Sequence, residues 1–455
     1  MSGVVLPLDE PELSFFDGGT LVRRSVHASG VRILTEHVPG AESATVGFWL
    51  PAGSRDEDGV VLGSTHFLEH LLFKGTPSRS ALDIAVAFDA VGGDHNAVTA
   101  KEYTCYYAKV RTRDLPMAVE VLSDMVAASE LDAKEFETER GVILEELAMA
   151  EDDPADVINE RFFEAVLSDH PLGRPIGGTP ETIESATREA VQEHYRATYR
   201  PSRLVVSAAG NVDHDELVRR VTEGLTRAGW DLGVPTAPEP RRVRAEASLQ
   251  PGRELVVVSR PTEQTHLLVG MPGLIAGDER RATLAVLSSI LGGGMSSRLF
   301  QEIREKRGLA YSVYAFAAAF SDAGVVGLSA ATAADNAGTV ARLLLDEFER
   351  LAAAGVTQEE VTRAVGYLSG SSALALEDSD VRMSRLGRAE IGTGEFVAFD
   401  EQVRRYEAVD RNMVQDLAQD LLSRPLTVAA LGAVDPESLA GLAGPASARA
   451  AVAHA

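Results

Sequence analysis

The most constraining feature of this 455-residue sequence is the run His66-Phe67-Leu68-Glu69-His70, within the segment Gly63–Thr76. No proline interrupts the segment, and Ser64 or Thr65 can cap its start. Its apolar side chains share one helical face, namely Phe67, Leu68, Leu71 and Leu72. The pattern predicts a helix with two histidines one turn apart on the same face. Two imidazoles at that spacing can share a tetrahedral Zn²⁺, leaving positions for another protein ligand and a water.

Glu69 is the acidic residue of the same motif, and it lies beside the histidines around the helix axis. The order His-x-x-Glu-His is the reverse of the His-Glu-x-x-His zinc protease signature, with the same ligands and general base. An accidental match would leave two imidazoles in an apolar helix without partners, which is unfavourable. The sequence therefore predicts one Zn²⁺ per chain, with His66 and His70 as ligands and Glu69 as catalytic base.

The composition limits the classes of binding partner and the cellular compartment that we expect for this protein. The hydrophobic content of 45% and charged content of 24% are those of an ordinary soluble protein. A formal charge of −25 argues against nucleic acid and membrane surfaces as partners and permits basic peptides as substrates. Cys105 is the only cysteine, so no intrachain disulfide can form. We see no signal-peptide pattern and no apolar run of transmembrane length, and expect a cytoplasmic protein.

Strand and helix patterns alternate along the chain, which predicts an α+β fold with helices packed on a mostly antiparallel sheet. Strand patterns cover residues 20–25, 31–36, 44–50, 96–99, 103–110 and 204–209. Helical patterns follow the zinc motif at residues 80–90, 115–128, 132–150, 155–167 and 181–198.

An internal repeat divides the chain into two similar halves. Leu204–Asp213 resembles Leu426–Asp435, and Leu131–Val142 resembles Val356–Tyr367. Both pairs have nearly the same offset of about 220 residues, which predicts a duplication. At the position of the zinc motif the second half reads Leu284–Leu291, without a ligand, so only the first half can bind the metal.

The stretch between the halves is rich in proline and charge, which is typical of a linker. We therefore expect a zinc-binding half at residues 1–232, a linker at 233–252, a half without metal at 253–440 and a frayed tail at 441–455.

Two histidines leave the zinc site one protein ligand short, and the helix that opens at Asp132 offers two candidates. Glu139 and Glu146 are seven residues apart and share a face. Two helical turns separate them by about 10 Å, so both are not expected to reach one zinc. Glu145 points about 100° away and fits less well. Spacing alone leaves Glu139 and Glu146 tied, and either glutamate can instead be a solvated charge.

The motif HFLEHLLFKGT, with Glu139 and Glu146 downstream, resembles the pitrilysin-type inverted-zinc metallopeptidases. Within that family the chain is most similar to the mitochondrial processing peptidase and its bacterial relatives. The resemblance extends over nearly the whole chain, including GGDHNAVTAKEYTCYY and GGGMSSRLFQEIREKRGLAYSVYA. It implies that His66, His70 and Glu146 are the zinc ligands and Glu69 the base, with Glu139 assisting the site geometry and catalysis.

The resemblance also implies substrate contacts in both halves. Asn96 and Ala97 match a strand segment that pairs with extended substrate. Arg304 and Tyr311 match a pair that holds substrate and stabilises the tetrahedral oxyanion. Without the resemblance, simple surface packing explains the spacing of Arg304 and Tyr311. A turn or a close backbone approach likewise explains Gly292–Gly294, which resembles the family's glycine-rich segment.

Together these features predict a zinc-dependent endopeptidase that cleaves peptides or unfolded segments, with its two halves forming a clam-shell around a chamber. Because one chain carries both the metal motif and the Arg–Tyr pair, we expect a homodimer without a separate partner subunit; the alternative is a monomer that closes on itself. The alternative function is a catalytically inactive structural or binding subunit. A zinc enzyme that acts on a non-peptide substrate is a third reading.

Overall fold

The computed structural model describes residues 3–249, 255–442 and 451–452. The expected linker at 233–252 and tail at 441–455 therefore lie partly outside the described residues. The chain forms two compact units. Unit 1 comprises residues 1–147, 175–242 and 373–401, and unit 2 comprises residues 148–174, 243–372 and 402–455.

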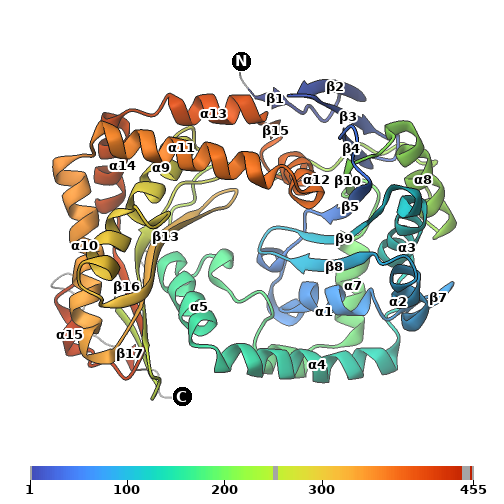
Figure 1. Cartoon of the computed structure of the whole chain (residues 1–455). Helices are drawn as coiled ribbons and strands as arrows, with labels where there is room; N and C mark the ends of the chain where they lie inside the picture. The colour runs from blue at the N-terminus through green and yellow to red at the C-terminus, as the bar shows by residue number, and fades with distance from the viewer. Residues whose placement is uncertain (1–2, 250–254, 443–450, 453–455) are drawn as a thin grey trace. The chain divides into compact units, whose positions relative to one another are not determined.

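Unit 1 is built on a seven-stranded sheet with the order β2-β3-β4-β10-β5-β9-β8 (Figure 1). All neighbouring strands are antiparallel except β4 and β10. The strands are β2 (Glu12–Asp17), β3 (Thr20–Val26), β4 (Arg32–His37), β5 (Ser43–Leu50), β8 (Asp94–Thr99), β9 (Thr104–Arg111) and β10 (Val205–Gly210). The mostly antiparallel sheet predicted for the first half is thus confirmed.

Helices cover both faces of this sheet, because its strands carry apolar side chains on both. One face packs against helices that include the zinc-motif helix and buries Ile33, Phe48 and Val206. These helices are α1 (Ser64–Leu71), α2 (Ala81–Asp89), α3 (Leu115–Ala128), α4 (Ala133–Asp152), α7 (Arg188–Thr198) and α8 (His214–Arg227). The other face buries Leu34 and Trp49 under α12 (Ser379–Arg388), drawn in orange beside β5 and β10 in Figure 1.

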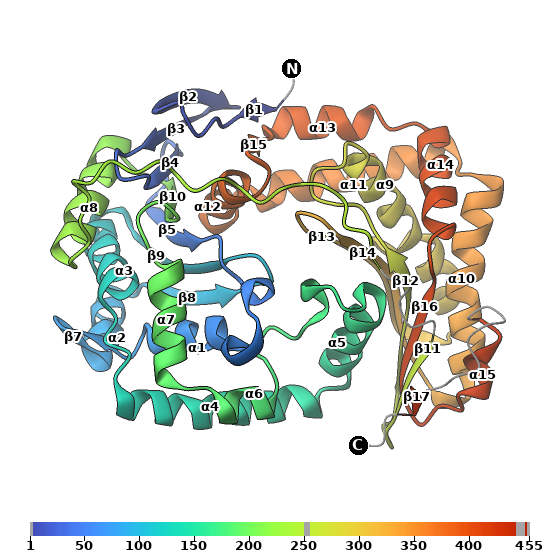
Figure 2. The ribbon, with the colours of Figure 1, turned by 180° about the vertical axis from the view of Figure 1, so that it is seen from behind.

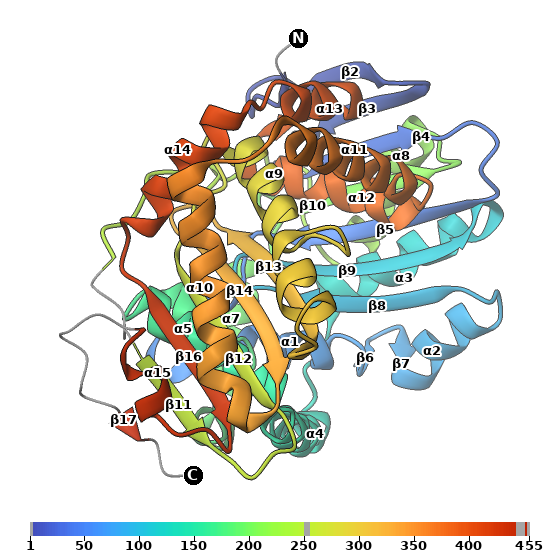
Figure 3. The same cartoon turned by 60° about the vertical axis from the view of Figure 1, so that its left-hand side comes forward.

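Unit 2 repeats this plan with the sheet order β13-β14-β12-β16-β11-β17. Its strands are β11 (Leu255–Ser259), β12 (Thr265–Pro272), β13 (Ala310–Ala319), β14 (Gly324–Thr332), β16 (Thr427–Gly432) and β17 (Ala451–Val452). Leu255 and Val257 of β11 face one core, and Val256 and Val258 face the other. Helices α9 (Arg281–Gly292), α10 (Ala337–Ala354) and α14 (Arg411–Leu422) cover the first face, and α5 (Pro154–Leu167) covers the second (Figures 2 and 3).

The repeated sequence segments occupy equivalent places in the two units. β10 pairs with β4 in parallel and β5 in antiparallel, and β16 pairs with β11 in parallel and β12 in antiparallel. The second pair of repeats falls on α4 and α11 (Gln358–Ala375). The predicted pair of similar α+β halves is therefore confirmed.

The compact units differ from the two consecutive halves expected from the sequence, because each takes a segment from the other half of the chain. Helix α5 precedes the linker but packs on the sheet of unit 2, and α12 follows it but packs on the sheet of unit 1. The two helices cover equivalent sheet faces. Each sheet has a second apolar face that its own half leaves open, and the exchanged helix buries it.

The helical pattern at 181–198 is two helices, α6 (Pro180–Ser185) and α7. Between them Ala186 leaves the helical conformation with ψ 136°, and Thr187 caps α7 by accepting a hydrogen bond from the Ala190 backbone N–H at 3.2 Å. Arg140 of α4 donates to the carbonyl oxygens of Glu184 and Ala186 at 3.0 and 2.9 Å. The break is stabilised from outside the segment, which its periodicity alone does not show.

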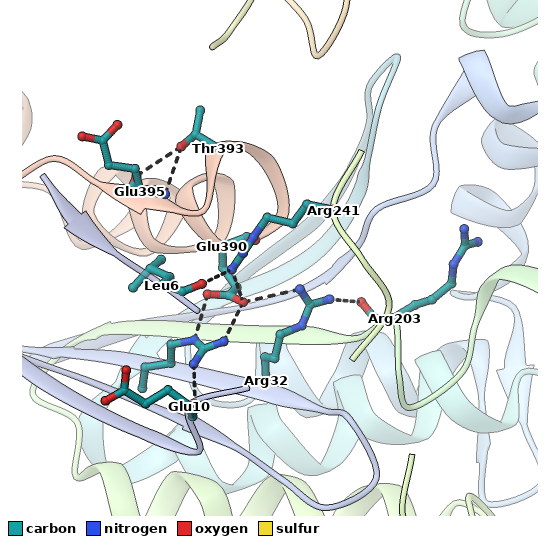
Figure 4. Close-up of polar contacts among 9 residues, drawn as sticks. Leu6, Glu10, Arg32, Arg203, Arg241, Glu390, Thr393 and Glu395 are labelled. Atoms are coloured by element: carbon teal, nitrogen blue, oxygen red, sulfur yellow. Dashed lines mark hydrogen bonds and ion pairs between the residues drawn. The ribbon is translucent and has the colours of Figure 1, made fainter. Parts of the chain in front are cut away.

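A buried ionic cluster ties distant parts of the chain into unit 1 (Figure 4). The Glu390 carboxylate accepts from Arg24 Nε at 2.9 Å, Arg241 Nη2 at 2.9 Å and Arg32 Nη1 at 3.4 Å. Glu390 and Arg24 are fully buried. Arg241, in the stretch expected to be a linker, also donates to the Leu6 carbonyl oxygen at 2.8 Å. One carboxylate thus joins β3, β4, the stretch around Arg241 and the segment after α12.

Replacing Glu390 with glutamine should destabilise the protein by about 3–5 kcal/mol, because the buried guanidinium groups of Arg24 and Arg32 then lose the carboxylate that pairs with them. The measurement is the free energy of unfolding in denaturant, compared with the exposed variant Glu42→Gln as control. Equal unfolding free energies for the two variants would show that the cluster does not stabilise unit 1.

Candidate metal centre

The packing of α1 on α4 creates the candidate site. The rings of Phe67 in α1 and Phe136 in α4 stack with centroids 4.5 Å apart and planes 10° apart. Both rings are buried, as is Ile143 two turns further along α4. Glu139 and Glu146 recur on the same stripe of α4 as these apolar residues, so the packing turns both glutamates toward the histidine face of α1.

Three ligand atoms converge between these helices. His66 Nε2 and His70 Nε2 are 3.3 Å apart, and Glu146 Oε2 lies 3.3 Å from His70 Nε2 and 3.6 Å from His66 Nε2. Around a tetrahedral zinc, neighbouring ligand atoms are about 3.3–3.4 Å apart. The triangle therefore has the size of one face of a zinc tetrahedron. Within the described residues it is the only group of three or more His, Cys, Asp or Glu side chains placed to bind a metal.

Glu139 occupies a different position from Glu146, outside the triangle of ligand atoms. Its Oε2 lies 3.0 Å from His70 Nδ1, on the far side of the imidazole from the triangle, and its Oε1 lies 2.7 Å from Lys74 Nζ. Glu139 is 2% exposed, whereas the side chain of Glu146 is 53% exposed. A carboxylate beside Nδ1 keeps the proton on that nitrogen and leaves the Nε2 lone pair for a metal.

The electrostatics of the triangle suit a cation. Burial, and then the neighbouring His70, lowers the pKa of His66, which favours the neutral imidazole that binds metals. Two imidazole nitrogens and a carboxylate oxygen then face one another with their lone pairs. Such a donor set of His₂Glu, with a fourth position left open, is the set used by catalytic zinc sites.

Glu69 lies on the same helix, and its orientation is fixed by a residue that the sequence patterns did not single out. Thr99 Oγ1 of strand β8 donates a short hydrogen bond to Glu69 Oε2. Thr99 lies two residues after Ala97 on the same strand, so the two side chains share one face of the sheet. Ala97 packs against the core that contains α1. This two-residue spacing could have identified Thr99 from the sequence, because it places both side chains on the face of the sheet that α1 covers.

Asn96 and Ala97 lie on β8, which is the last strand of its sheet and pairs only with β9 among the described strands. Asn96 is exposed, and its Oδ1 accepts a hydrogen bond from the Ala97 N–H at 2.8 Å. An extended peptide that pairs with this edge has to replace that local bond. The substrate role of the two residues stays a prediction.

Arg304 and Tyr311 are in direct contact in unit 2. Arg304 Nη1 donates to the Tyr311 carbonyl oxygen at 3.0 Å, and its Cζ lies 4.5 Å from the centre of the Tyr311 ring. Tyr311 is 76% exposed, so its ring is accessible. Gly292 shows the close backbone approach considered for the triple glycine, because a Cβ there would lie 2.3 Å from the Ala315 nitrogen.

Comparison with known proteins places the chain in a family. A model of insulinase (peptidase family M16) matches residues 32–180, and a model of the peptidase M16 inactive domain matches residues 185–368. An uncharacterized zinc protease of Streptomyces coelicolor is 46% identical over 416 residues, covering 90% of this chain and 89% of that protein. An uncharacterized zinc protease of Bacillus subtilis is 36% identical over 410 residues, covering 90% and 98%. The chain belongs to peptidase family M16, as its motif predicted.

Solved structures share the fold at low sequence identity. The crystal structure of a peptidase M16 inactive domain from Pseudomonas fluorescens has a TM-score of 0.81 at 19% identity and covers 91% of this chain and 98% of its own. A protease from Helicobacter pylori has a TM-score of 0.82 at 20% identity and covers 90% and 98%. Among the described helices, none has the length and apolar character needed to cross a bilayer.

Replacing Glu139 with glutamine should weaken zinc binding about 10- to 100-fold, because the amide no longer holds the proton on His70 Nδ1 as a carboxylate does. The dissociation constant is measured by competition with a chromogenic chelator. Glu145→Gln, an exposed change in the same helix, is the control. Equal affinities for the two variants would contradict the role given to Glu139.

Proposed function

We propose that this chain is a zinc-dependent endopeptidase that cleaves peptides or unfolded segments in the manner of a processing peptidase. The observation that carries the proposal is the triangle of His66, His70 and Glu146 ligand atoms, 3.3–3.6 Å apart, with Glu69 on the same helix. Membership of peptidase family M16 and the zinc protease names of the relatives support it.

When bound, the Zn²⁺ supplies Lewis acidity toward the scissile carbonyl and the attacking water. Glu69 is the general base: its carboxylate accepts a proton from the water as the oxygen attacks the carbonyl carbon. The same proton then passes to the leaving nitrogen as the peptide bond breaks, which returns Glu69 to its charged form. The hydrogen bond from Thr99 engages one carboxylate oxygen and so keeps the other directed for this transfer.

Substrate binding uses the open edge of β8. An extended peptide adds to that edge through main-chain hydrogen bonds, with contacts at Asn96 and Ala97. This mode selects chains that can adopt a strand, which are peptides and unfolded segments. The formal charge of −25 favours basic peptides. Arg304 and Tyr311 hold the substrate and stabilise the oxyanion, a role that rests on the family resemblance.

A homodimer in the cytoplasm completes the proposal. One chain carries both the candidate metal ligands and the Arg304–Tyr311 pair. A second copy of the same chain can therefore replace a separate partner subunit. The single cysteine fits a reducing compartment.

Cleavage of a basic quenched-fluorescent peptide of about ten residues tests this function. Replacing Glu69 with glutamine should lower kcat/KM by about 10²- to 10⁴-fold, because the amide cannot accept the proton. Zinc content, measured in parallel, should equal that of the wild type, since Glu69 is not a ligand.

The exposed variant Glu145→Gln serves as control and should cleave like the wild type. Wild-type protein that binds zinc but cleaves no peptide would contradict the endopeptidase. Wild-type protein that binds no zinc would favour the alternative of a catalytically inactive structural or binding subunit.

A further inference from the structure

The zinc-motif helix begins without a capping side chain of its own. Its N-cap residue is Gly63, which has a left-handed conformation with φ 88° and offers no side chain to accept a hydrogen bond. The first N–H groups of a helix have no partner within the helix. Because the start of α1 is buried, these groups need an acceptor from another part of the chain.

Glu57 supplies that acceptor. Its Oε2 accepts from the Gly63 N–H at 2.7 Å, and its Oε1 accepts from the Thr65 N–H at 2.5 Å. The residue is 2% exposed, so both bonds are shielded from water. A carboxylate at this place also faces the positive end of the α1 dipole. The capping group thus lies six residues before the N-cap residue Gly63.

The loop that carries Glu57 is itself held in place. The neighbouring Asp56 accepts from Arg242 Nη1 at 2.6 Å and from the Gly53 N–H at 2.9 Å. Thr65, the second residue bonded to Glu57, also contacts α7, where its Oγ1 lies 3.2 Å from His194 Nε2. The first turn of α1 is therefore anchored on two sides.

This anchor lies directly before the metal ligands, since His66 follows Thr65 and His70 follows one turn later. A small shift or fraying of the first turn would move His66 Nε2, which lies 3.6 Å from Glu146 Oε2, out of the triangle. We propose that Glu57 is a positioning residue of the metal centre, which caps the first turn of α1 and thereby holds His66 at its corner of the ligand triangle. The inference rests on the proposed zinc function.

The burial of Glu57 distinguishes it from an ordinary surface cap. Burial raises the pKa of Glu57 to about 7, so holding this carboxylate out of water is unfavourable. The N–H donors of α1 offset part of that cost. A serine or threonine at the N-cap would satisfy the helix at no such cost. The Glu57 carboxylate instead holds the first turn of α1 at two points, the Gly63 and Thr65 N–H groups. Such a contact is better explained by a role in positioning the turn than by stability alone.

The test compares Glu57→Gln with Asp213→Ala, which removes the cap of another helix in unit 1. Asp213 Oδ1 accepts from the Glu216 N–H at 2.8 Å at the start of α8, away from the zinc motif. The zinc dissociation constant of each folded, metal-free variant is measured by chelator competition, and the unfolding midpoint by circular dichroism.

Glu57→Gln should weaken zinc binding about tenfold or more, because the glutamine amide presents one acceptor oxygen in place of two. Asp213→Ala should lower the unfolding midpoint but leave zinc affinity unchanged. At saturating zinc, Glu57→Gln should also lower kcat while KM stays near the wild-type value. Glu57→Asp, which keeps the carboxylate, should recover part of the affinity and replaces the glutamine variant if that one does not fold.

The outcomes separate this inference from the function on which it rests. Zinc affinity that is equal in wild type and in the folded Glu57 variants overturns the positioning role and leaves the peptidase intact. A loss of zinc affinity that Asp213→Ala shares to the same degree overturns it as well, because the effect is then general destabilisation. Wild-type protein that binds no zinc overturns both proposals.

Discussion

The candidate metal centre depends on the packing of one short helix on one long helix. The stacked rings of Phe67 and Phe136 set how α1 and α4 face each other. Aromatic stacking in a close-packed core leaves little freedom to slide or rotate, because any shift opens a void or a clash. The apolar contact therefore decides the distance between the histidines of α1 and Glu146 of α4. The polar chemistry of the site is arranged by a hydrophobic interface.

Around the candidate metal centre, groups from different elements contact the side chains of the proposed site. Glu139, charge-paired with Lys74, sets the tautomer of His70. Thr99 orients Glu69 from the sheet, and Glu57 caps the helix from the preceding loop. A ligand or base held from two sides has few alternative orientations, which is how a site keeps geometry within the tolerance that catalysis needs. Each support acts on one ligand or base, so each can be tested separately.

Local pattern predicted most elements of the first half and the helix that carries the candidate site. Periodicity placed α1, α3 and most strands of the first sheet, because apolar spacing reports which face is buried. What local pattern does not contain is contact between distant segments. The exchange of α5 and α12 depends on which sheet face is left open, and the break between α6 and α7 depends on Arg140 of another helix. The capping role of Glu57 likewise depends on the loop that folds back onto the start of α1. For the same reason spacing left Glu139 and Glu146 tied.

The measurement that bears most directly on the central claim is anomalous diffraction at the zinc absorption edge from a crystal of the zinc-loaded protein. We predict one peak per chain, at about 2.0–2.2 Å from His66 Nε2, His70 Nε2 and a carboxylate oxygen of Glu146, with Glu139 on His70 Nδ1. A peak ligated by Glu139 in place of Glu146, or no peak beside these two histidines, would contradict the account.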